Sequence, residues 1–263
     1  MTCTKHCDKI KYGGGTWQEH TGICHICGEY KKLTYEHIPP EAAFNSQRRK
    51  MSTVKELMEN KKDNRAPWDI EGLKYKQFQQ GTGFFTLCGE CNSFTGAKYG
   101  VTYSDFIKAI GAEILKIPKE KRKQGLSFHL LAFFKQVISM FCSLNTEQFG
   151  ISFKDFLLNE SSTNFDTSIY KVCMYLHAGH VDRLVPFQTQ LNIKTGNMEF
   201  CSEISTFPVG FIFYDISHNR TTSFCGSDIT SFSQCDYSSL YNLDIQIPFL
   251  ECNTPFGLDF RTF

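Results

Sequence analysis

The sequence predicts an α+β fold built from two parts. Two Cys-x-x-Cys pairs, Cys24–Cys27 and Cys88–Cys91, are sixty residues apart, which is typical of two knuckles that share one tetrahedral zinc ion. A long apolar stretch over residues 126–145 predicts a buried helix, and short apolar runs broken by turn signals follow residue 165. We therefore expect a zinc-stabilised front core and a second α+β domain with a long buried helix and a largely antiparallel sheet.

Residues 1–23 are expected to form a polar N-terminal arm, because they contain no apolar run and include the flexible break Gly13–Gly15. Cys3, His6 and Cys7 lie close together there, but no fourth ligand has the spacing to join them. A loose arm is therefore favoured over a small extra metal site. The start of the chain also lacks the apolar run of a targeting segment, so we expect a cytoplasmic protein.

The front core should begin with a strand over residues 31–37. Pro39 and Pro40 end this strand, because proline cannot donate a hydrogen bond to a neighbouring strand. His37 is thereby placed at the strand terminus, where its side chain can point into a cleft. A lone histidine is usually a packing residue, but Glu36 beside it and the flanking cysteine pairs favour a catalytic role.

Residues 41–82 are longer than a minimal connection between two core strands and are interpreted as an insertion. Thr53 and Glu56 form a capping-box pattern, which predicts a short helix with a narrow apolar stripe. Lysines and arginines surround this helix, and two interpretations stay open: an ordinary solvated helix, or an arm that faces nucleic-acid phosphates beside the cleft. Trp68 is expected to pack rather than to stack on a base.

The rest of the front core leads into the second cysteine pair and beyond it. The expected elements are strands at 73–79 and 84–87, a turn at 81–83, and a helix from 92 to 116 interrupted at Gly96 and Gly100. Asn92 directly follows Cys91, so its side chain could cap this helix or bind a metal ion. The position directly after the knuckle favours the metal ion.

The order of these residues resembles that of the HNH endonucleases, the ββα-metal finger nucleases. In that family one strand ends in an acidic residue and the general-base histidine, and a second strand leads to a Cys-x-x-Cys knuckle followed by an asparagine. Glu36-His37 matches the first pattern and Leu87–Asn92 matches the second. The resemblance covers roughly residues 20–105. It departs from the family at position 36, where aspartate is more usual than glutamate.

The resemblance implies one catalytic and one structural metal. His37 would be the general base, and Glu36 and Asn92 would hold a divalent cation, Mg²⁺ or Mn²⁺. The middle asparagine that steadies the histidine in the family has no clear counterpart here, and Gln80 is the nearest candidate. A zinc ion with four thiolates has no open coordination position and would be structural. Its ligands would be Cys24, Cys27, Cys88 and Cys91.

A basic linker at residues 117–125 predicts the boundary between a nuclease domain, residues 24–117, and a second domain, residues 126–263. The helix predicted at 126–145 is apolar on most of its circumference and should be central to that domain. Strands are predicted at 168–177, 188–193, 198–204, 209–216 and 243–247. His177 and His180 have no matched ligand partners and are assigned to a loop, and the cysteines of this half are expected to be buried free thiols.

The near-zero net charge conceals an asymmetry between the two halves. Residues 1–125 carry 21 lysines and arginines against 14 acidic residues, whereas residues 126–263 carry 7 against 13. The basic front half predicts a nucleic-acid partner, because Lys and Arg contacts to phosphates supply most non-specific affinity. DNA is favoured over RNA, and no membrane contact is expected. The acidic back half would bind a regulatory protein or another copy of the chain.

Together these features predict an HNH-type metal-dependent endonuclease that hydrolyses phosphodiester bonds, by analogy an effector of an anti-phage or mobile-element system. The alternative is a zinc-knuckle module that binds nucleic acid without cleaving it. Such a module would need the cysteine pairs and the basic insertion, but it would not need Glu36, His37 and Asn92 together.

Overall fold

The computed structural model describes residues 20–59, 72–114, 126–178, 181–192, 197–217, 224–243, 246–252, 257 and 260–262. Helices and strands are both abundant in these residues, which confirms the predicted α+β class. The expectations for the first nineteen residues, for Trp68, for the linker at 117–125 and for His180 lie outside the described residues. None of the described helices combines the length and the apolar character needed to cross a membrane.

The front half contains a three-stranded antiparallel sheet in the order β1-β2-β5. Its strands are β1 (His20–Ile23), β2 (Tyr30–His37) and β5 (Gly83–Cys88). The second strand ends at His37, as the two prolines predicted. The first strand is a correction, because residues 20–23 were expected in a loose arm and instead pair with β2 from His20↔Leu33 to Ile23↔Tyr30.

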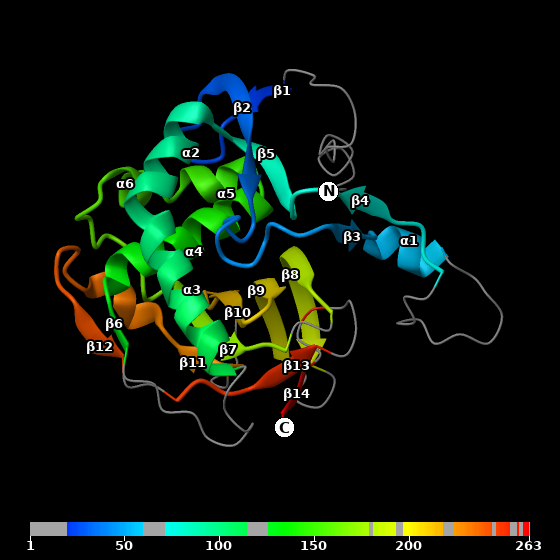
Figure 1. Cartoon of the computed structure of the whole chain (residues 1–263). Helices are drawn as coiled ribbons and strands as arrows, with labels where there is room; N and C mark the ends of the chain where they lie inside the picture. Colours follow the sequence, from blue (N-terminus) through cyan, green and yellow to red (C-terminus); the bar gives the residue numbers. More distant parts are fainter. Residues whose placement is uncertain are drawn as a thin grey trace.

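A helical path leaves the end of β5 and crosses the front of the molecule (Figure 1). It consists of α2 (Gly89–Thr95), a π-helical segment η2 (Gly96–Gly100) and α3 (Val101–Ile114). The interruption lies at the two glycines that predicted it. Helix α2 begins earlier than predicted, with Cys88 as its N-cap. Asn92 is therefore inside the helix, and the interpretation of Asn92 as an N-cap is wrong.

The insertion forms an arm that projects from the body of the molecule (Figure 1). Its elements are β3 (Arg49–Met51), α1 (Val54–Glu59) and β4 (Lys76–Phe78). The two strands pair with each other as an antiparallel ribbon. The predicted capping box is confirmed, because the Thr53 amide donates to Glu56 Oε2 at 2.7 Å and the Glu56 amide donates to Thr53 Oγ1 at 3.2 Å. We call β3, α1 and β4 the β3–β4 arm.

The back half is dominated by a five-stranded antiparallel sheet in the order β11-β7-β10-β9-β8, which confirms the predicted largely antiparallel sheet. Its strands are β7 (Tyr170–Leu176), β8 (Arg183–Asn192), β9 (Asn197–Thr206), β10 (Val209–Asp215) and β11 (Ser227–Asp228). Smaller elements surround it: β6 (Leu126–Phe128), α5 (Glu147–Ile151), α6 (Lys154–Leu158), the 3₁₀ helix η3 (Thr230–Gln234), β12 (Tyr241–Leu243), β13 (Leu250–Cys252) and β14 (Phe260–Thr262).

The predicted long apolar helix lies at the centre of the fold, but it begins at Leu130 and not at residue 126, because Leu126–Phe128 form strand β6. Helix α4 (Leu130–Leu144) has every residue buried, and it contacts both β5 of the front sheet and β8 of the large sheet. One continuous apolar core accordingly runs from Cys24 of the first knuckle to Ile247 near the C-terminus. The two halves of the chain therefore pack against each other directly, with α4 between them (Figure 1).

Lys135 lies in the middle of α4 and is fully buried. Its ammonium group donates to the carbonyl oxygens of Phe156 and, at 2.7 Å, Asn159, where helix α6 ends. These carbonyls have no partner within their own helix, so the lysine satisfies them. Burial lowers the pKa of Lys135 to about 7.

Candidate metal centre and candidate active site

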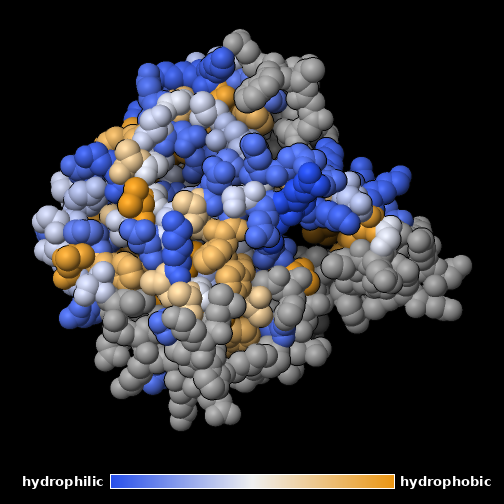
Figure 2. Space-filling model, viewed as in Figure 1, coloured by the Kyte–Doolittle hydropathy of each residue, from blue (hydrophilic) through white to orange (hydrophobic). Residues whose placement is uncertain are grey.

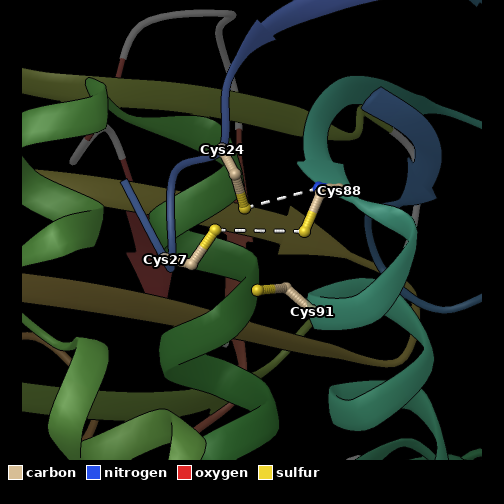
Figure 3. A group of neighbouring side chains, drawn as sticks. All are labelled: Cys24, Cys27, Cys88 and Cys91. Carbon is tan, nitrogen blue, oxygen red and sulfur yellow. Dashed lines mark hydrogen bonds between the residues drawn. The ribbon is translucent and has the colours of Figure 1, made fainter. Parts of the chain in front are cut away.

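The four predicted zinc ligands converge on one point (Figure 3). The sulfur atoms of Cys24, Cys27, Cys88 and Cys91 all lie within 4.8 Å of one another, and Cys27 Sγ is 4.0 Å from Cys88 Sγ. Four sulfurs around a tetrahedral zinc ion, each about 2.3 Å from the metal, lie about 3.8 Å apart. None of the four forms a disulfide. The cluster therefore has the composition and size of a metal centre. The two cysteine pairs lie side by side in the fold although sixty residues separate them in the sequence.

The first cysteine pair sits in a tight turn between β1 and β2. The Cys24 amide donates to the Glu29 carbonyl at 2.9 Å, and the Gly28 amide donates to the Cys24 carbonyl at 3.0 Å. Gly28 has φ +79°, a conformation that glycine adopts without strain. The amide of Cys88 donates to Cys24 Sγ at 3.3 Å, so the second knuckle also supports a sulfur of the first.

The environment of the cluster favours a negatively charged sulfur. The Cys91 thiol forms a hydrogen bond with the sulfur of Cys24, and backbone amides, including that of Cys88, point at the same sulfur. These hydrogen bonds outweigh the effect of burial and lower the pKa of Cys24 to about 4. The same contact raises the pKa of Cys91, and burial raises that of Cys27. One sulfur is thus held as a thiolate by its neighbours, and a divalent cation would let the others release their protons as well.

The metal cluster is anchored to the back half of the chain through His25. Its Nδ1 lies 2.9 Å from the carbonyl oxygen of Cys142 in α4. Its own carbonyl oxygen lies against Gly150 in α5, where an added Cβ would come within 2.1 Å of it. The first knuckle is therefore pressed onto α4 and α5 at a position that requires glycine.

The residues of the candidate active site are placed by the alternation of side chains along β2. Glu36 pairs with Phe84 on β5, and Phe84 belongs to the apolar core, so the glutamate lies on the inward face of the sheet. Thr34 lies on the same face, and it accepts a hydrogen bond of 3.0 Å from the side-chain nitrogen of Asn92 in α2. Glu36 and Asn92 therefore share the face on which α2 packs.

Asn92 is oriented by both of its hydrogen bonds to β2. Its Nδ2 donates to Thr34 Oγ1 at 3.0 Å and to the Tyr35 carbonyl oxygen at 3.3 Å. The amide nitrogen is occupied on the strand side, and no described residue donates a hydrogen bond to the side-chain oxygen. That oxygen is an available ligand for a hard cation such as Mg²⁺.

Glu36 is buried without compensation. Its residue is only 7% exposed, and burial raises the pKa of its carboxyl group to about 8. Among the residues that the structure describes, no hydrogen-bond donor and no basic side chain contacts this carboxyl group. A buried carboxylate is costly unless it is paired or coordinates a metal ion. This is the environment that a bound cation would stabilise.

His37 is the last residue of β2, and alternation places it on the face opposite Glu36. Its Nε2 lies 2.9 Å from the main-chain carbonyl oxygen of Gln80. A carbonyl oxygen can only accept, so Nε2 carries the proton and Nδ1 of the neutral ring keeps its lone pair. The contact therefore selects the tautomer in which Nδ1 can act as a base.

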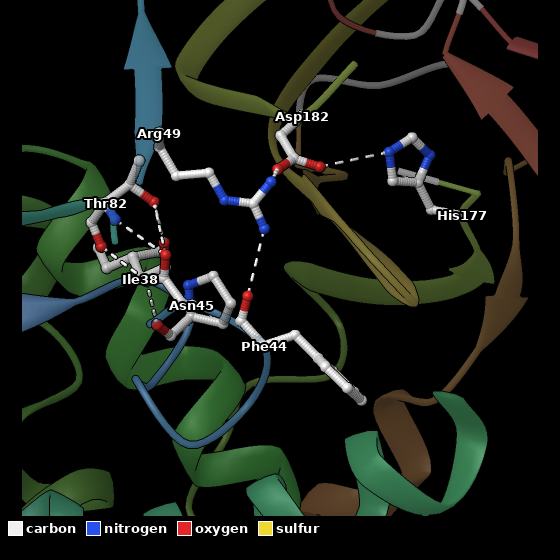
Figure 4. A network of polar contacts seen from close by, with 8 residues as sticks. Ile38, Phe44, Asn45, Arg49, Thr82, His177 and Asp182 are labelled. Carbon is white, nitrogen blue, oxygen red and sulfur yellow. Dashed lines mark hydrogen bonds and ion pairs between the residues drawn. The ribbon is translucent and has the colours of Figure 1, made fainter. Parts of the chain in front are cut away.

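Gln80 does contact His37, but it does so through its main chain, whereas the sequence suggested its side-chain amide. The buried amide of this region is Asn45, which sequence analysis missed. Asn45 Nδ2 donates to the carbonyl oxygens of Pro39 at 2.6 Å and Thr82 at 2.8 Å, and the Thr82 amide donates back to Asn45 Oδ1 at 2.8 Å (Figure 4). Asn45 thus ties the segment after His37 to the turn that carries Gln80. No spacing rule pointed to it.

A chain of polar contacts continues from this turn into the back half (Figure 4). The Arg49 guanidinium donates to the Phe44 carbonyl oxygen at 3.2 Å and forms an ion pair of 2.9 Å with Asp182. The other carboxylate oxygen of Asp182 lies 3.7 Å from Nε2 of His177 at the end of β7. His177 follows β7 in a segment without regular structure, as the loop assignment predicted, and it is fully buried there.

The geometry therefore brings the acid, the amide and the four thiols to one sheet and its following helix, with the imidazole at the strand end. Comparison of the chain with family models, with curated proteins and with solved structures found no match. What the site does is accordingly inferred from its own chemistry.

Proposed function

We propose that the chain is an HNH-type metal-dependent endonuclease that hydrolyses phosphodiester bonds, with DNA as the preferred substrate. The observation that carries the proposal is the buried carboxyl group of Glu36. It has no partner among the described residues, it shares a face with the side-chain oxygen of Asn92, and it adjoins His37. A structural role for Glu36 would require a donor or a cation that the described residues do not supply.

In this proposal Glu36 and Asn92 hold a Mg²⁺ or Mn²⁺ ion, which supplies charge neutralisation at the scissile phosphate when it is bound. His37 takes a proton from the attacking water at Nδ1. Its Nε2 keeps its proton and donates it in a hydrogen bond to the Gln80 carbonyl oxygen, which fixes the ring and stabilises the imidazolium that forms. Glu36 is only 7% exposed, so the cation would lie close to the protein interior.

The four-cysteine centre serves a different purpose. Its ligand set suits zinc, because four thiolates in a tetrahedron fill the coordination shell of that ion. A closed shell leaves no position for water or substrate. We therefore assign this ion to holding the end of β5 and the start of α2 against the first knuckle, which fixes Asn92 relative to β2.

Nicking of supercoiled plasmid by the purified full-length chain tests the proposal, with Mg²⁺, with Mn²⁺ and without added divalent cation. We expect cation-dependent nicking and one zinc ion per chain. His37→Ala should lower the rate by about 10²–10⁴-fold, the usual contribution of a general base, with unchanged zinc content. Glu36→Gln should lower the nicking rate as well. The control is Glu90→Gln, which changes an exposed carboxylate in the first turn of α2 and should leave the rate unchanged.

Nicking that survives His37→Ala would remove the catalytic assignment. If the unsubstituted chain binds plasmid but does not nick it with either cation, the chain is a zinc-stabilised nucleic-acid-binding module and the proposed reaction is wrong.

A further inference from the structure

The β3–β4 arm is a folded element with its own small core. Leu57, Leu73 and Phe78 are each less than 9% exposed, and they belong to neither apolar cluster found for the described residues of the main body. Ser52 Oγ also donates to the Lys74 carbonyl oxygen at 2.8 Å, which joins the two strands just beyond the Met51–Lys76 end of the ribbon. The backbone of the arm is therefore folded, and its exposed side chains are carried on a paired ribbon.

The ribbon presents one polar face with an unusual pair of side chains. The register pairs Lys50 with Gln77, and Tyr75 lies two residues before Gln77 on the same face. Tyr75 is 51% exposed, which is high for a large aromatic residue. The Lys50 ammonium lies 4.4 Å from the centre of its ring, a cation–π contact that holds the charge in place. The ring face under Lys50 is therefore covered, and the lysine remains available to an anion.

The arm is strongly basic. Its described residues, 48–59 and 72–78, contain six basic side chains and two acidic ones, Glu56 and Glu59. One of the six, Arg49, is paired with Asp182, and the other five are exposed. The exposed cations are Arg48, Lys50, Lys55, Lys74 and Lys76. Figure 2 shows hydrophilic side chains gathered where the arm leaves the body. A polyanion is the partner that this charge favours.

The root of the arm is the turn that holds His37. Strand β4 ends at Phe78, two residues before Gln80, whose carbonyl oxygen contacts the imidazole. The other strand is tied to the same turn, because the Gly81 amide donates to the Gln47 carbonyl oxygen at 3.0 Å. A polymer that lies in the candidate active site must therefore pass the arm on one side.

We propose that the β3–β4 arm binds double-stranded DNA next to the scissile bond, with Lys50 and Lys74 contacting backbone phosphates; this rests on the proposed function. A two-stranded ribbon fits the major groove of DNA, which is about 12 Å wide. The covered face of Tyr75 opposes stacking of an unpaired base, so a duplex suits the arm better than a single strand. The arm thus supplies the affinity that the inward-facing Glu36 and Asn92 cannot.

The test measures binding without cleavage, on the full-length His37→Ala chain without added divalent cation. Its readout is the affinity for a short DNA duplex over a series of salt concentrations. Replacing both lysines, Lys50→Ala with Lys74→Ala, should weaken binding by about tenfold, and the slope of log affinity against log salt should become shallower by about 0.9 per lost phosphate contact. Lys154→Ala is the matched control, because Lys154 is an exposed lysine of α6 away from the arm.

Unchanged affinity and slope in the double variant would overturn the proposal, as would equal or tighter binding to the single strand of the same sequence. The outcome is independent of the proposed reaction. A chain that nicks DNA but whose arm variants bind normally refutes only the arm. A chain whose arm variants lose affinity but which never nicks DNA refutes only the nuclease.

Discussion

Replacement of Asn45 by alanine is the sharpest test of how His37 is positioned. The Asn45 side chain is 2% exposed and makes hydrogen bonds of 2.6, 2.8 and 2.8 Å to the main chain of Pro39 and Thr82. Each such bond contributes about 1 kcal/mol net, and each buried group left unpaired costs a further 1–3 kcal/mol. We therefore expect Asn45→Ala to lower the free energy of unfolding by about 3–5 kcal/mol, a large part of the typical 5–15 kcal/mol.

The same substitution should lower catalysis more than binding. Without the asparagine, the turn that carries the Gln80 carbonyl oxygen is tied to the segment after His37 only by the contacts between Ile38 and Thr82. A misplacement of about 1 Å lowers catalysis about a hundredfold, so kcat for nicking should fall while KM stays nearly constant. Urea unfolding and nicking kinetics measure the two effects, with Ser46→Ala as the control at an exposed neighbour. A loss below about 1 kcal/mol together with unchanged kcat would refute this account of the turn.

Two further substitutions separate main-chain from side-chain roles and test the buried lysine. Gln80→Ala should change the nicking rate by no more than about twofold and the free energy of unfolding by no more than about 0.5 kcal/mol, because only the main-chain carbonyl oxygen of Gln80 contacts His37. A large loss in either assay would show that the side-chain amide supports His37. Between pH 7 and pH 10, Lys135 is largely deprotonated in the folded chain and protonated in the unfolded chain. The free energy of unfolding should therefore rise with pH, by at most about 1.4 kcal/mol per pH unit. Lys135→Met should flatten that rise in urea titrations at several pH values, and an equal slope in both chains would contradict the lowered pKa.

The parts of the site that sequence analysis predicted correctly are the parts defined by local spacing. The Cys-x-x-Cys pairs predicted two knuckles, and the prolines predicted that β2 ends at His37. Gly96 and Gly100 predicted the interruption that the π-helical segment forms. Each of these depends on residues a few positions apart.

The parts that were missed depend on contacts between distant segments. Asn45 meets Thr82 across thirty-seven positions, and His25 meets Cys142 across 117, so neither pair leaves a pattern in a window of sequence. Strand β1 was missed because only its pairing with β2 makes a short polar stretch a strand. The role of Lys135 was missed because its partners, the carbonyl oxygens of Phe156 and Asn159, lie in another helix and its cap.

Helix α4 has no side that meets solvent, and this determines how the protein can be dissected. A fragment that ended before the helix would expose the aromatic interior beneath β5 to water, and such a surface aggregates. The C-terminal half is therefore a scaffold that the knuckles need in order to fold, whatever else it binds. Release of the C-terminal half as a detachable inhibitory module is incompatible with that arrangement, and any control of the proposed activity must act on the intact chain.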